Sequence, residues 1–285
     1  FKKEKYLMTI LTIAHGTYNN FEKFKITFLS ILKNLENFPQ VELLILDDST
    51  NNFSELFVKR HKSKQIRYFK GKKKSIDHAY IDLIRKAKGE YVWWFGDDSF
   101  FEDSILNVLN ILKKEPDFVW LNSIGEKKTI DYGKDLHLTA GEVITKIGDL
   151  ITNLSSLLWK RSFIYPHLDT GKQFFGNAVG FCYPQLEAIS KEGKFLYIDK
   201  PIFQSEIDRD FSNLWYDPFE VFATHYFNLL DFFKTKPNIT HSLKLEKQKR
   251  GRQILKGVLY YKYNNLLYGL GKTSFTNIFK VYRSW

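Results

Sequence analysis

Short apolar runs alternate with amphipathic segments over the first 120 residues of the chain. The apolar runs have the length of buried strands and cover residues 6–14, 41–46, 65–69, 90–95 and 118–122. Between them, apolar residues recur at helical spacing over residues 20–35, 53–62, 75–88 and 104–114. Strands that alternate with helices predict a doubly wound, mainly parallel α/β sheet, in which ligands bind beyond the carboxyl ends of the strands.

The alternation becomes weaker after Ser123. The later pattern predicts helices over 141–150 and 181–191 and strands over 155–158 and 195–198. Aromatic and glycine-rich pieces separate them, as is typical of a variable second half that wraps against one edge of a sheet. We therefore expect a domain over residues 1–231, with halves at 1–123 and 124–231, and a C-terminal tail over 232–285.

The formal net charge of the chain is +11, and it is unevenly distributed. Residues 232–285 contain twelve lysines and arginines but a single acidic residue, Glu246, whereas the preceding residues contain equal numbers of basic and acidic side chains. Such asymmetry is typical of a segment that meets an anionic surface, either membrane phospholipid or nucleic acid.

The tail combines this charge with apolar residues. One helical face would carry Phe275, Ile278, Phe279 and Tyr282. Basic residues that flank aromatic ones on an amphipathic segment favour a peripheral anchor on an anionic membrane. The alternative is a helical cap over the core with a solvated basic face. The sequence contains no recognition motif for DNA or RNA, so we expect no nucleic-acid partner.

The composition excludes several other classes of protein. With 44% hydrophobic residues the chain is neither disordered nor fibrous, and its single cysteine, Cys182, excludes internal disulfides and thiolate zinc clusters. No apolar run approaches the ~20 residues of a membrane-spanning helix, and the first residues do not resemble a signal peptide. We expect a globular protein of the cytoplasm.

Two pairs of adjacent aspartates follow two of the predicted strands. Asp47 and Asp48 follow one strand, and Asp97 and Asp98 follow another. Paired carboxylates at a strand end can hold a divalent cation that also binds phosphate oxygens, or they can belong to the capping turn of the next helix. Because parallel strands end at the same edge of a sheet, both pairs would face one crevice.

Three segments resemble motifs of glycosyltransferase family 2. The segment 15–19 (HGTYN) resembles the opening signature of that family, and 44–50 (LILDDST) resembles its first acidic strand end. The segment 87–99 (AKGEYVWWFGDDS) resembles the strand that leads to its metal motif. The residues 75–77 and the strand before Asp97 are most similar to the abequosyltransferase-like branch. The resemblance implies a GT-A fold, a Rossmann-like doubly wound mixed sheet, here with a helical, basic, amphipathic C-terminal extension.

The resemblance also assigns roles to individual residues. It implies that Thr17 and Tyr18 line a nucleotide pocket and that Asp48 accepts hydrogen bonds from the base, usually uracil. Asp77, at the start of the next helix, would also contact the nucleotide. Asp97 would lie near the ribose and diphosphate.

Asp98 would be the direct ligand of Mg²⁺ or Mn²⁺ by the same resemblance. Two departures from the family pattern occur nearby: Gly16 stands in place of the usual proline, and Ser99 stands at the third acidic position of the metal motif. The second departure leaves fewer carboxylates around the cation.

The catalytic base is missing from its usual place, because residues 179–183 contain no carboxylate. An inverting transfer needs a group that accepts the proton of the attacking hydroxyl within ~2.6–3.2 Å. Asp169 and Glu187 are the two candidates in the sequence that we rank equally, and a cluster at Glu206, Asp208 and Asp210 lies further along the chain.

These observations together predict an inverting transferase that moves a hexose from a UDP-sugar to a lipid-linked glycan. The acceptor would be a polyprenyl-diphosphate oligosaccharide or a lipooligosaccharide at the inner face of the cell membrane. A sugar-nucleotide pyrophosphorylase is an alternative, but residues 15–20 lack the basic, glycine-rich loop of that class. A membrane-docking protein with a degenerate site that binds only nucleotide is another.

Overall fold

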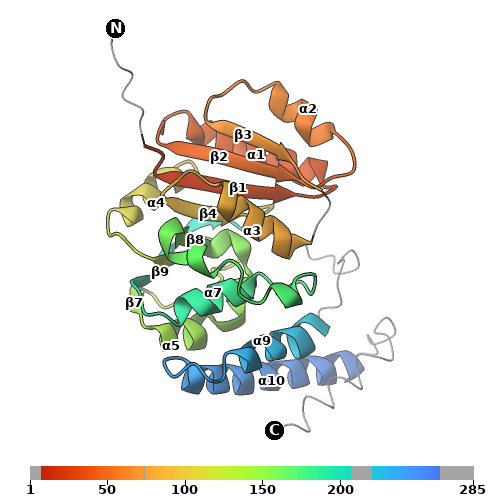
Figure 1. The fold of residues 1–285 in the computed structure, drawn as a ribbon, viewed down its shortest axis with the longest axis vertical. Helices are drawn as coiled ribbons and strands as arrows, with labels where there is room; N and C mark the ends of the chain where they lie inside the picture. Colours follow the sequence, from red (N-terminus) through yellow and green to blue (C-terminus); the bar gives the residue numbers. More distant parts are fainter. Residues whose placement is uncertain (1–7, 73–74, 207–219, 264–285) are drawn as a thin grey trace.

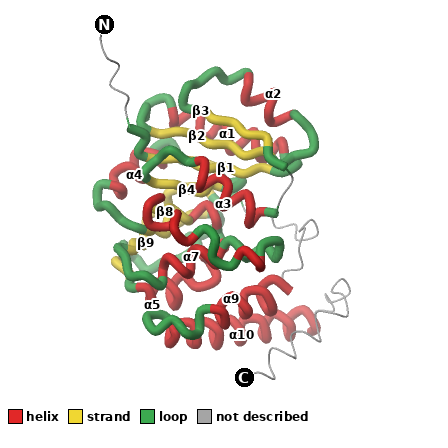
Figure 2. Tube along the Cα trace, in the orientation of Figure 1, coloured by secondary structure: helices red, strands yellow, loops and turns green. Residues whose placement is uncertain are grey.

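The described part of the chain forms a nine-stranded mixed sheet with helices on both faces (Figures 1 and 2). The computed structural model describes residues 8–72, 75–206 and 220–263. The strands are β1 (Leu11–Thr17), β2 (Val41–Asp47), β3 (Ile66–Lys70), β4 (Tyr91–Phe95), β5 (Ser99–Phe100), β6 (Phe118–Ile124), β7 (Leu136–Leu138), β8 (Leu157–Lys160) and β9 (Phe195–Gln204). Their spatial order is β3-β2-β1-β4-β8-β6-β9-β5, and β7 pairs with β9.

Most strands of this sheet run in the same direction. β1 is parallel to both β2 and β4, β2 is parallel to β3, and β6 is parallel to β9. β8 is antiparallel to its neighbours β4 and β6, so it reverses direction between two parallel groups. The six parallel strands therefore end at the same edge. This arrangement confirms the predicted α/β fold with a mixed, doubly wound sheet.

The helices cover two hydrophobic layers, one on each face of the sheet. They are α1 (Phe21–Leu35), α2 (Phe53–Lys59), α3 (Ile76–Lys86), α4 (Ser104–Leu112), α5 (Ala140–Glu142), α6 (Arg161–Ile164), α7 (Cys182–Ile189), α9 (Tyr226–Phe232) and α10 (Thr240–Tyr263). Because successive side chains of a strand point to opposite faces, Trp93 packs in the layer of α1 and α4, and Trp94 packs in the layer of α3 and α7. β4 is apolar throughout because both of its faces are buried.

The segment between β7 and β8 differs in part from the sequence prediction. The helical prediction over 141–150 is confirmed, but the helix is irregular: the short α-helix α5 leads into a π-helical turn at Val143–Ile147 and a 3₁₀ turn at Gly148–Thr152. Gly148 has a φ of 56°, a left-handed conformation that ends the regular helix and that glycine adopts without strain. The chain can therefore turn back toward the sheet at this point.

The helices α9 and α10 lie at the end of the molecule furthest from β3 (Figure 1). Phe233, Ile239 and Leu243 are buried in the same hydrophobic layer as α3 and α7. The first part of the predicted tail therefore packs on the core, whereas its predicted amphipathic face at 275–282 lies outside the described residues. Among the described residues, no helix combines the length and apolar character needed to cross a membrane.

A buried carboxylate stands where α10 meets the rest of the protein. Glu246 is 1% exposed, and its Oε1 accepts hydrogen bonds from the Asp149 amide at 3.3 Å and the Tyr226 hydroxyl at 3.4 Å. Lys249 Nζ, on the same helix, lies 3.7 Å from Glu246 Oε2. Burial raises the pKa of Glu246 from 4.5 to about 7, and the contacts with Lys249 and Tyr226 only partly oppose this effect.

This raised pKa predicts how stability depends on pH. The folded protein binds a proton at Glu246 that the unfolded chain has lost, so the free energy of unfolding falls as the pH rises from about 4.5 through about 7. Glu246→Gln cannot ionise and should gain about 3 kcal/mol relative to the parent between pH 5 and pH 8. Urea unfolding at several pH values measures this gain, with the exposed Glu102→Gln as control; equal pH dependence in all three proteins would contradict it.

Candidate active site

The candidate site lies where β2 and β4 end on either side of β1. Thr17 is in register with Asp47 on β2, and His15 is in register with Phe95 on β4. Asp48 and Asp97, which follow those strands, therefore flank the end of β1. The chain passes to β2 on one side of β1 and to β4 on the other, and such a reversal of strand order is where ligands bind in open α/β sheets.

Two asparagines after β1 connect the two acidic strand ends. The backbone amide of Asn19 donates to Ser49 Oγ at 2.8 Å, and Asn19 Oδ1 accepts from the Thr50 amide at 2.9 Å. Asn20 Nδ2 donates to Asp97 Oδ2 at 3.4 Å. Asn19 holds a φ of 50°, which asparagine tolerates better than most residues. The loop after β1 thus fixes the β2 and β4 ends relative to each other.

The two members of the first acidic pair have different environments. Asp47 is fully buried, and its carboxylate accepts hydrogen bonds from the Tyr68 hydroxyl at 2.5 Å, the Ser49 amide at 2.8 Å and Lys70 Nζ at 3.2 Å. Burial alone would raise the pKa of Asp47, but these bonds outweigh it and lower the pKa. Asp47 therefore stabilises the turn that presents Asp48.

The place of the Asp48 side chain depends on a glycine. The Gly71 amide donates to Asp47 O at 2.8 Å, which draws the chain after β3 against the acidic turn. A Cβ atom at Gly71 would lie 1.8 Å from Asp48 Oδ1, so any other residue there would displace this carboxylate. Thr17 and Tyr18 lie at the adjacent end of β1; the buried Thr17 hydroxyl makes no hydrogen bond within the described part of the chain, and Tyr18 is half exposed.

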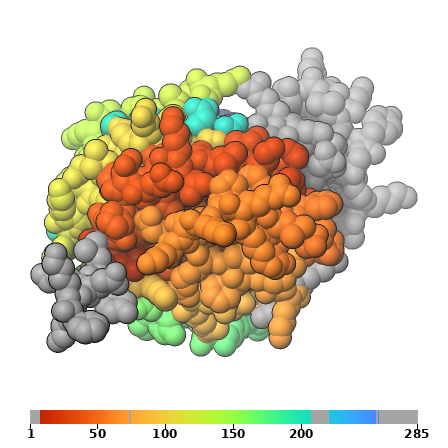
Figure 3. Space-filling view, turned by 90° about the horizontal axis from the view of Figure 1, so that it is seen from above, coloured from red at the N-terminus to blue at the C-terminus, as the bar shows by residue number. Residues whose placement is uncertain are grey.

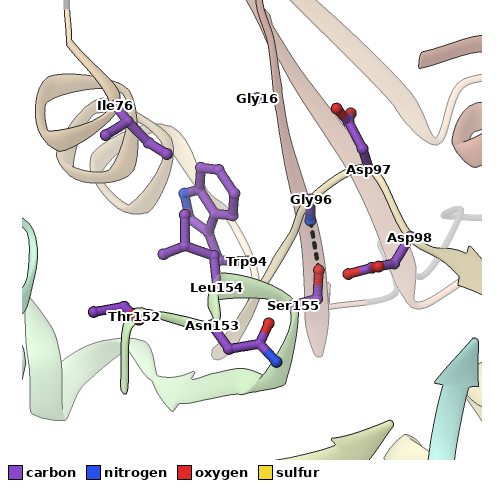
Figure 4. Close-up of a pocket in the computed structure, with 10 residues that line it drawn as sticks. All are labelled: Gly16, Ile76, Trp94, Gly96, Asp97, Asp98, Thr152, Asn153, Leu154 and Ser155. Carbon is purple, nitrogen blue, oxygen red and sulfur yellow. Dashed lines mark hydrogen bonds between the residues drawn. The ribbon is translucent and has the colours of Figure 1, made fainter. Parts of the chain in front are cut away.

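A cavity of about 310 Å³ opens beside the end of β4 (Figure 4). It is lined by Gly16, Ile76, Trp94, Gly96, Asp97, Asp98, Thr152, Asn153, Leu154 and Ser155. Asp98 points toward Ser155, whereas Asp97 points in a different direction (Figure 4). The cavity therefore has an acidic rim from β4, an apolar wall that includes Trp94, and a polar wall from the segment before β8.

Asp98 is held by backbone and side-chain donors. Its Oδ1 accepts from the Glu206 amide at 3.0 Å, and its carboxylate also interacts with the Ser155 hydroxyl. Burial raises the pKa of Asp98, and the negative charges of Asp97 and Glu206 raise it further against those hydrogen bonds. Like charges held together in this way favour a cation between them.

These residues fit a divalent cation that is shared with a substrate. The described residues contain no group of three or more His, Cys, Asp or Glu side chains arranged to hold a metal by protein ligands alone. Mg²⁺ commonly binds through one or two carboxylates and takes its other ligands from water and substrate phosphates. Asp98, with Asp97 and Glu206 nearby, offers the oxygen ligands that this arrangement requires.

His15 is a part of the site that the sequence pattern did not single out. Its ring is buried next to Phe24, and its Nδ1 lies 2.9 Å from Phe95 O. Burial lowers the pKa of His15, although the charges of Asp97 and Asp98 oppose this shift. A neutral ring under the acidic strand end supports the backbone of β4 without neutralising its carboxylates.

Asp77 does not line the cavity, and its contact with a nucleotide stays a prediction. It is fully buried at the start of α3, and its carboxylate accepts from the amides of Gly176 at 2.6 Å and Phe181 at 2.9 Å. Burial raises the pKa of Asp77 against these bonds. Its role is to hold the loop before α7 against α3, while its neighbour Ile76 reaches the cavity.

The two candidate bases also lie away from the cavity lining. Asp169 is exposed and pairs with Lys172 at 2.6 Å and Arg85 at 2.5 Å, contacts that lower its pKa. Glu187 pairs with Lys236 at 2.9 Å and Lys191 at 3.1 Å; burial alone would raise the pKa of Glu187, but these pairs lower it. A carboxylate that is paired in this way accepts a proton poorly, so the structure gives neither prediction support.

The comparisons with known proteins agree with this geometry. The model of "Glycosyl transferase family 2" matches residues 12–168. No curated protein matches the chain significantly. Among solved structures, S. aureus TarS 1–349 in complex with UDP-GlcNAc has a TM-score of 0.66 at 10% identity and covers 95% of this chain and 79% of its own. A mannosyltransferase from Pyrobaculum calidifontis, in complex with GDP-Man and Mn²⁺, has a TM-score of 0.54 at 13% identity, with 95% and 83% covered.

The family match, together with the fold, thus defines a glycosyltransferase. The chain belongs to glycosyl transferase family 2, because the family model matches more than half of it and includes β1, β2, β4 and the cavity wall before β8. The match to the abequosyltransferase-like branch stays a prediction.

The contact between Gly71 and Asp48 yields a test of the nucleotide pocket. Gly71→Ala should displace the Asp48 carboxylate and weaken UDP binding about tenfold, the effect of losing a hydrogen bond to a charged group. Isothermal titration with UDP measures the loss. Gly141→Ala, whose added Cβ atom would lie nearest to Ser242 Oγ, is the control. Asp48→Ala should add nothing to Gly71→Ala, and additive losses would show that the glycine acts elsewhere.

Proposed function

We propose that the protein is an inverting, metal-dependent transferase that moves a hexose from a UDP-sugar to a lipid-linked glycan acceptor. One observation supports this most: the β2 and β4 ends flank β1 and place Asp48 and Asp97 around one strand end, with Asp98 at the rim of a cavity. A nucleoside diphosphate carries its base at one end and its phosphates at the other. It could therefore contact Asp48 with the base and Asp97 and Asp98 with the diphosphate.

The donor would lie along the strand ends. Asp48 would accept a hydrogen bond from the N–H of the base, and Thr17 and Tyr18 would contact the nucleoside from the end of β1. The diphosphate would reach Asp97 and Asp98. A divalent cation held by Asp98 would supply Lewis-acid stabilisation of the departing diphosphate. TarS in complex with UDP-GlcNAc supports a UDP-sugar, and the mannosyltransferase with GDP-Man and Mn²⁺ supports a metal.

The transfer step places demands on the cavity. The acceptor hydroxyl attacks the anomeric carbon, the bond from that carbon to the diphosphate oxygen breaks, and the hydroxyl proton passes to a carboxylate. Trp94 and Leu154 exclude water from one side, while Asn153 and Ser155 can orient hydroxyl groups. Among the carboxylates considered from the sequence, Glu206 is the one whose backbone lies next to Asp98, while Asp208 and Asp210 lie outside the described residues.

The acceptor and the membrane are proposed from the charge of the C-terminal region. On α10, Lys247, Lys249 and Arg250 form ion pairs within the protein, but Lys244, Arg252 and Lys256 are exposed. The exposed cations, together with the basic residues that follow, favour peripheral binding to anionic lipid at the cytoplasmic face of the membrane. A polyprenyl-diphosphate or lipooligosaccharide acceptor would be found there.

The alternative function is a protein that only binds nucleotide, since no catalytic base is identified. Membership of family 2 argues against a pyrophosphorylase.

A donor screen tests the activity and the role of Asp98. We expect UDP release from a UDP-hexose, in preference to GDP- and TDP-sugars, when membrane lipid extract and Mn²⁺ or Mg²⁺ are present. Chelation should stop release, and Asp98→Ala should lower the rate about 100-fold because stabilisation of the leaving group is lost. Asp103→Asn, which breaks an exposed pair with Lys200, is the control. Full turnover by Asp98→Ala or after chelation would refute the metal role.

Vesicle binding tests the proposed anchor. Each exposed cation near an anionic bilayer contributes about 1 kcal/mol, so replacing Lys244, Arg252 and Lys256 by Gln should weaken binding about 100-fold. Co-sedimentation with vesicles of phosphatidylserine and phosphatidylcholine measures this, and vesicles of phosphatidylcholine alone show the contribution of charge. Unchanged binding of the triple variant would remove α10 from the membrane contact.

A further inference from the structure

The polar wall of the cavity belongs to a segment that touches α10 at one end and the acidic strand end at the other. We call residues 148–155 the wall segment. Its last four residues line the cavity, and its first two contact α10. Two tight turns follow those first residues, with hydrogen bonds from the Asn153 amide to Leu150 O at 2.8 Å and from the Ser156 amide, just after the segment, to Asn153 O at 3.1 Å. The segment is short and has little freedom to adjust.

The contacts with α10 are close and largely hidden from solvent. A Cβ atom at Gly148 would lie 2.6 Å from Glu246 Oε1, so the carboxylate rests directly on this glycine. Glu246 also accepts the Asp149 amide at 3.3 Å. The Asp149 carboxylate forms an ion pair with Arg250, and these side chains are 18% and 15% exposed. Both backbone and side chain of the wall segment are therefore attached to α10.

At the other end, Ser155 joins the wall segment to β4. Its carbonyl oxygen accepts from Trp93 Nε1 at 2.7 Å, and its Oγ accepts from the Gly96 amide at 2.9 Å (Figure 4). Its hydroxyl also interacts with the Asp98 carboxylate. A movement of Asp149 would therefore be transmitted to the residues on which the proposed metal ligand depends.

We propose that Arg250 and Glu246 are positioning residues for the transfer site, because they fix the wall segment and through it place Ser155 against Gly96 and Asp98. This inference rests on the proposed function. It assigns to α10 a role in the geometry of a cavity that the helix itself does not line.

The energetics of the pair favour this role over simple stabilisation. Burial lowers the pKa of Arg250 to about 10, so the protein bears a desolvation penalty at this position. A buried ion pair often adds no more stability than well-packed apolar residues, but it does define orientation. The same helix has a comparison pair, Lys247 with Asp231 at 2.9 Å, which attaches α10 to α9 without touching the wall segment.

Fluorine NMR of protein labelled with 5-fluorotryptophan tests the proposal without any ligand. Trp93→Phe assigns the Trp93 signal, which reports the hydrogen bond to Ser155. Arg250→Gln should shift or broaden this signal, and the charge-matched control Lys247→Gln should not. Asp149→Asn removes the same pair from the other side and serves as a second variant if Arg250→Gln does not fold. An unchanged Trp93 signal in the folded variant overturns the proposal.

The role of Glu246 is tested by the same signal. Glu246→Ala removes the acceptor of the Asp149 amide and should shift the Trp93 signal, whereas Glu246→Gln keeps an oxygen at that position and should restore it. A purely structural role would move neither signal, so equal spectra for Glu246→Ala and the parent would remove Glu246 from the proposal.

Titration with UDP and Mn²⁺ then separates this proposal from the proposed function. We expect Arg250→Gln to bind UDP with Mn²⁺ about fivefold more weakly than Lys247→Gln, a typical size for coupling through packed residues. Failure of the parent protein to bind would refute the proposed function, and the Trp93 signal would still decide the coupling. Binding by the parent with equal affinities for the two variants would overturn the positioning role alone.

Discussion

The carboxylates at the ends of β2 and β4 are the electrostatic constraint on which the rest of the site depends. Because both strands pair with β1, the sheet brings Asp48 and Asp97 to one edge, and the chain just after β9 places the Glu206 amide against Asp98. Like charges repel, and burial penalises the charged form of Asp98. Hydrogen-bond donors from the surrounding backbone and side chains stabilise these carboxylates. The acidic rim of the cavity could then bind a cation together with a diphosphate.

Within the acidic pairs, each carboxylate has its own task. Asp47 accepts hydrogen bonds from Tyr68, Ser49 and Lys70 and stabilises the turn on which Asp48 lies. In the rest of the molecule, too, some residues stabilise the fold and others provide the polar groups of the site. The two hydrophobic layers hold the strand ends in register, and the loops beyond them carry the polar groups. Figure 3 shows the end of the molecule above β3, which the N-terminal part of the chain (red to orange) covers.

The second half of the chain completes the cavity and does not form a separate lobe. β8 enters the sheet between β4 and β6, which places the preceding wall segment against Gly96. α10 packs against that segment through Glu246, which is 97 positions from Asp149 in the sequence. A helix that the charge pattern suggested as part of a tail is thus joined, through Asp149, to the geometry of the site.

The sequence by itself determined which segments form the strands next to the site. Its apolar pattern located β1, β2 and β4, and the aspartates after β2 and β4 identified the acidic edge of the sheet. Periodicity reports local burial, so these elements were predictable. The surroundings of Asp77, Asp169 and Glu187 were decided only by tertiary structure, because their partners Gly176, Arg85 and Lys236 are remote in the chain. A carboxylate looks the same in any sequence; whether it binds substrate, anchors a loop or pairs with a cation depends on which donors the fold places around it.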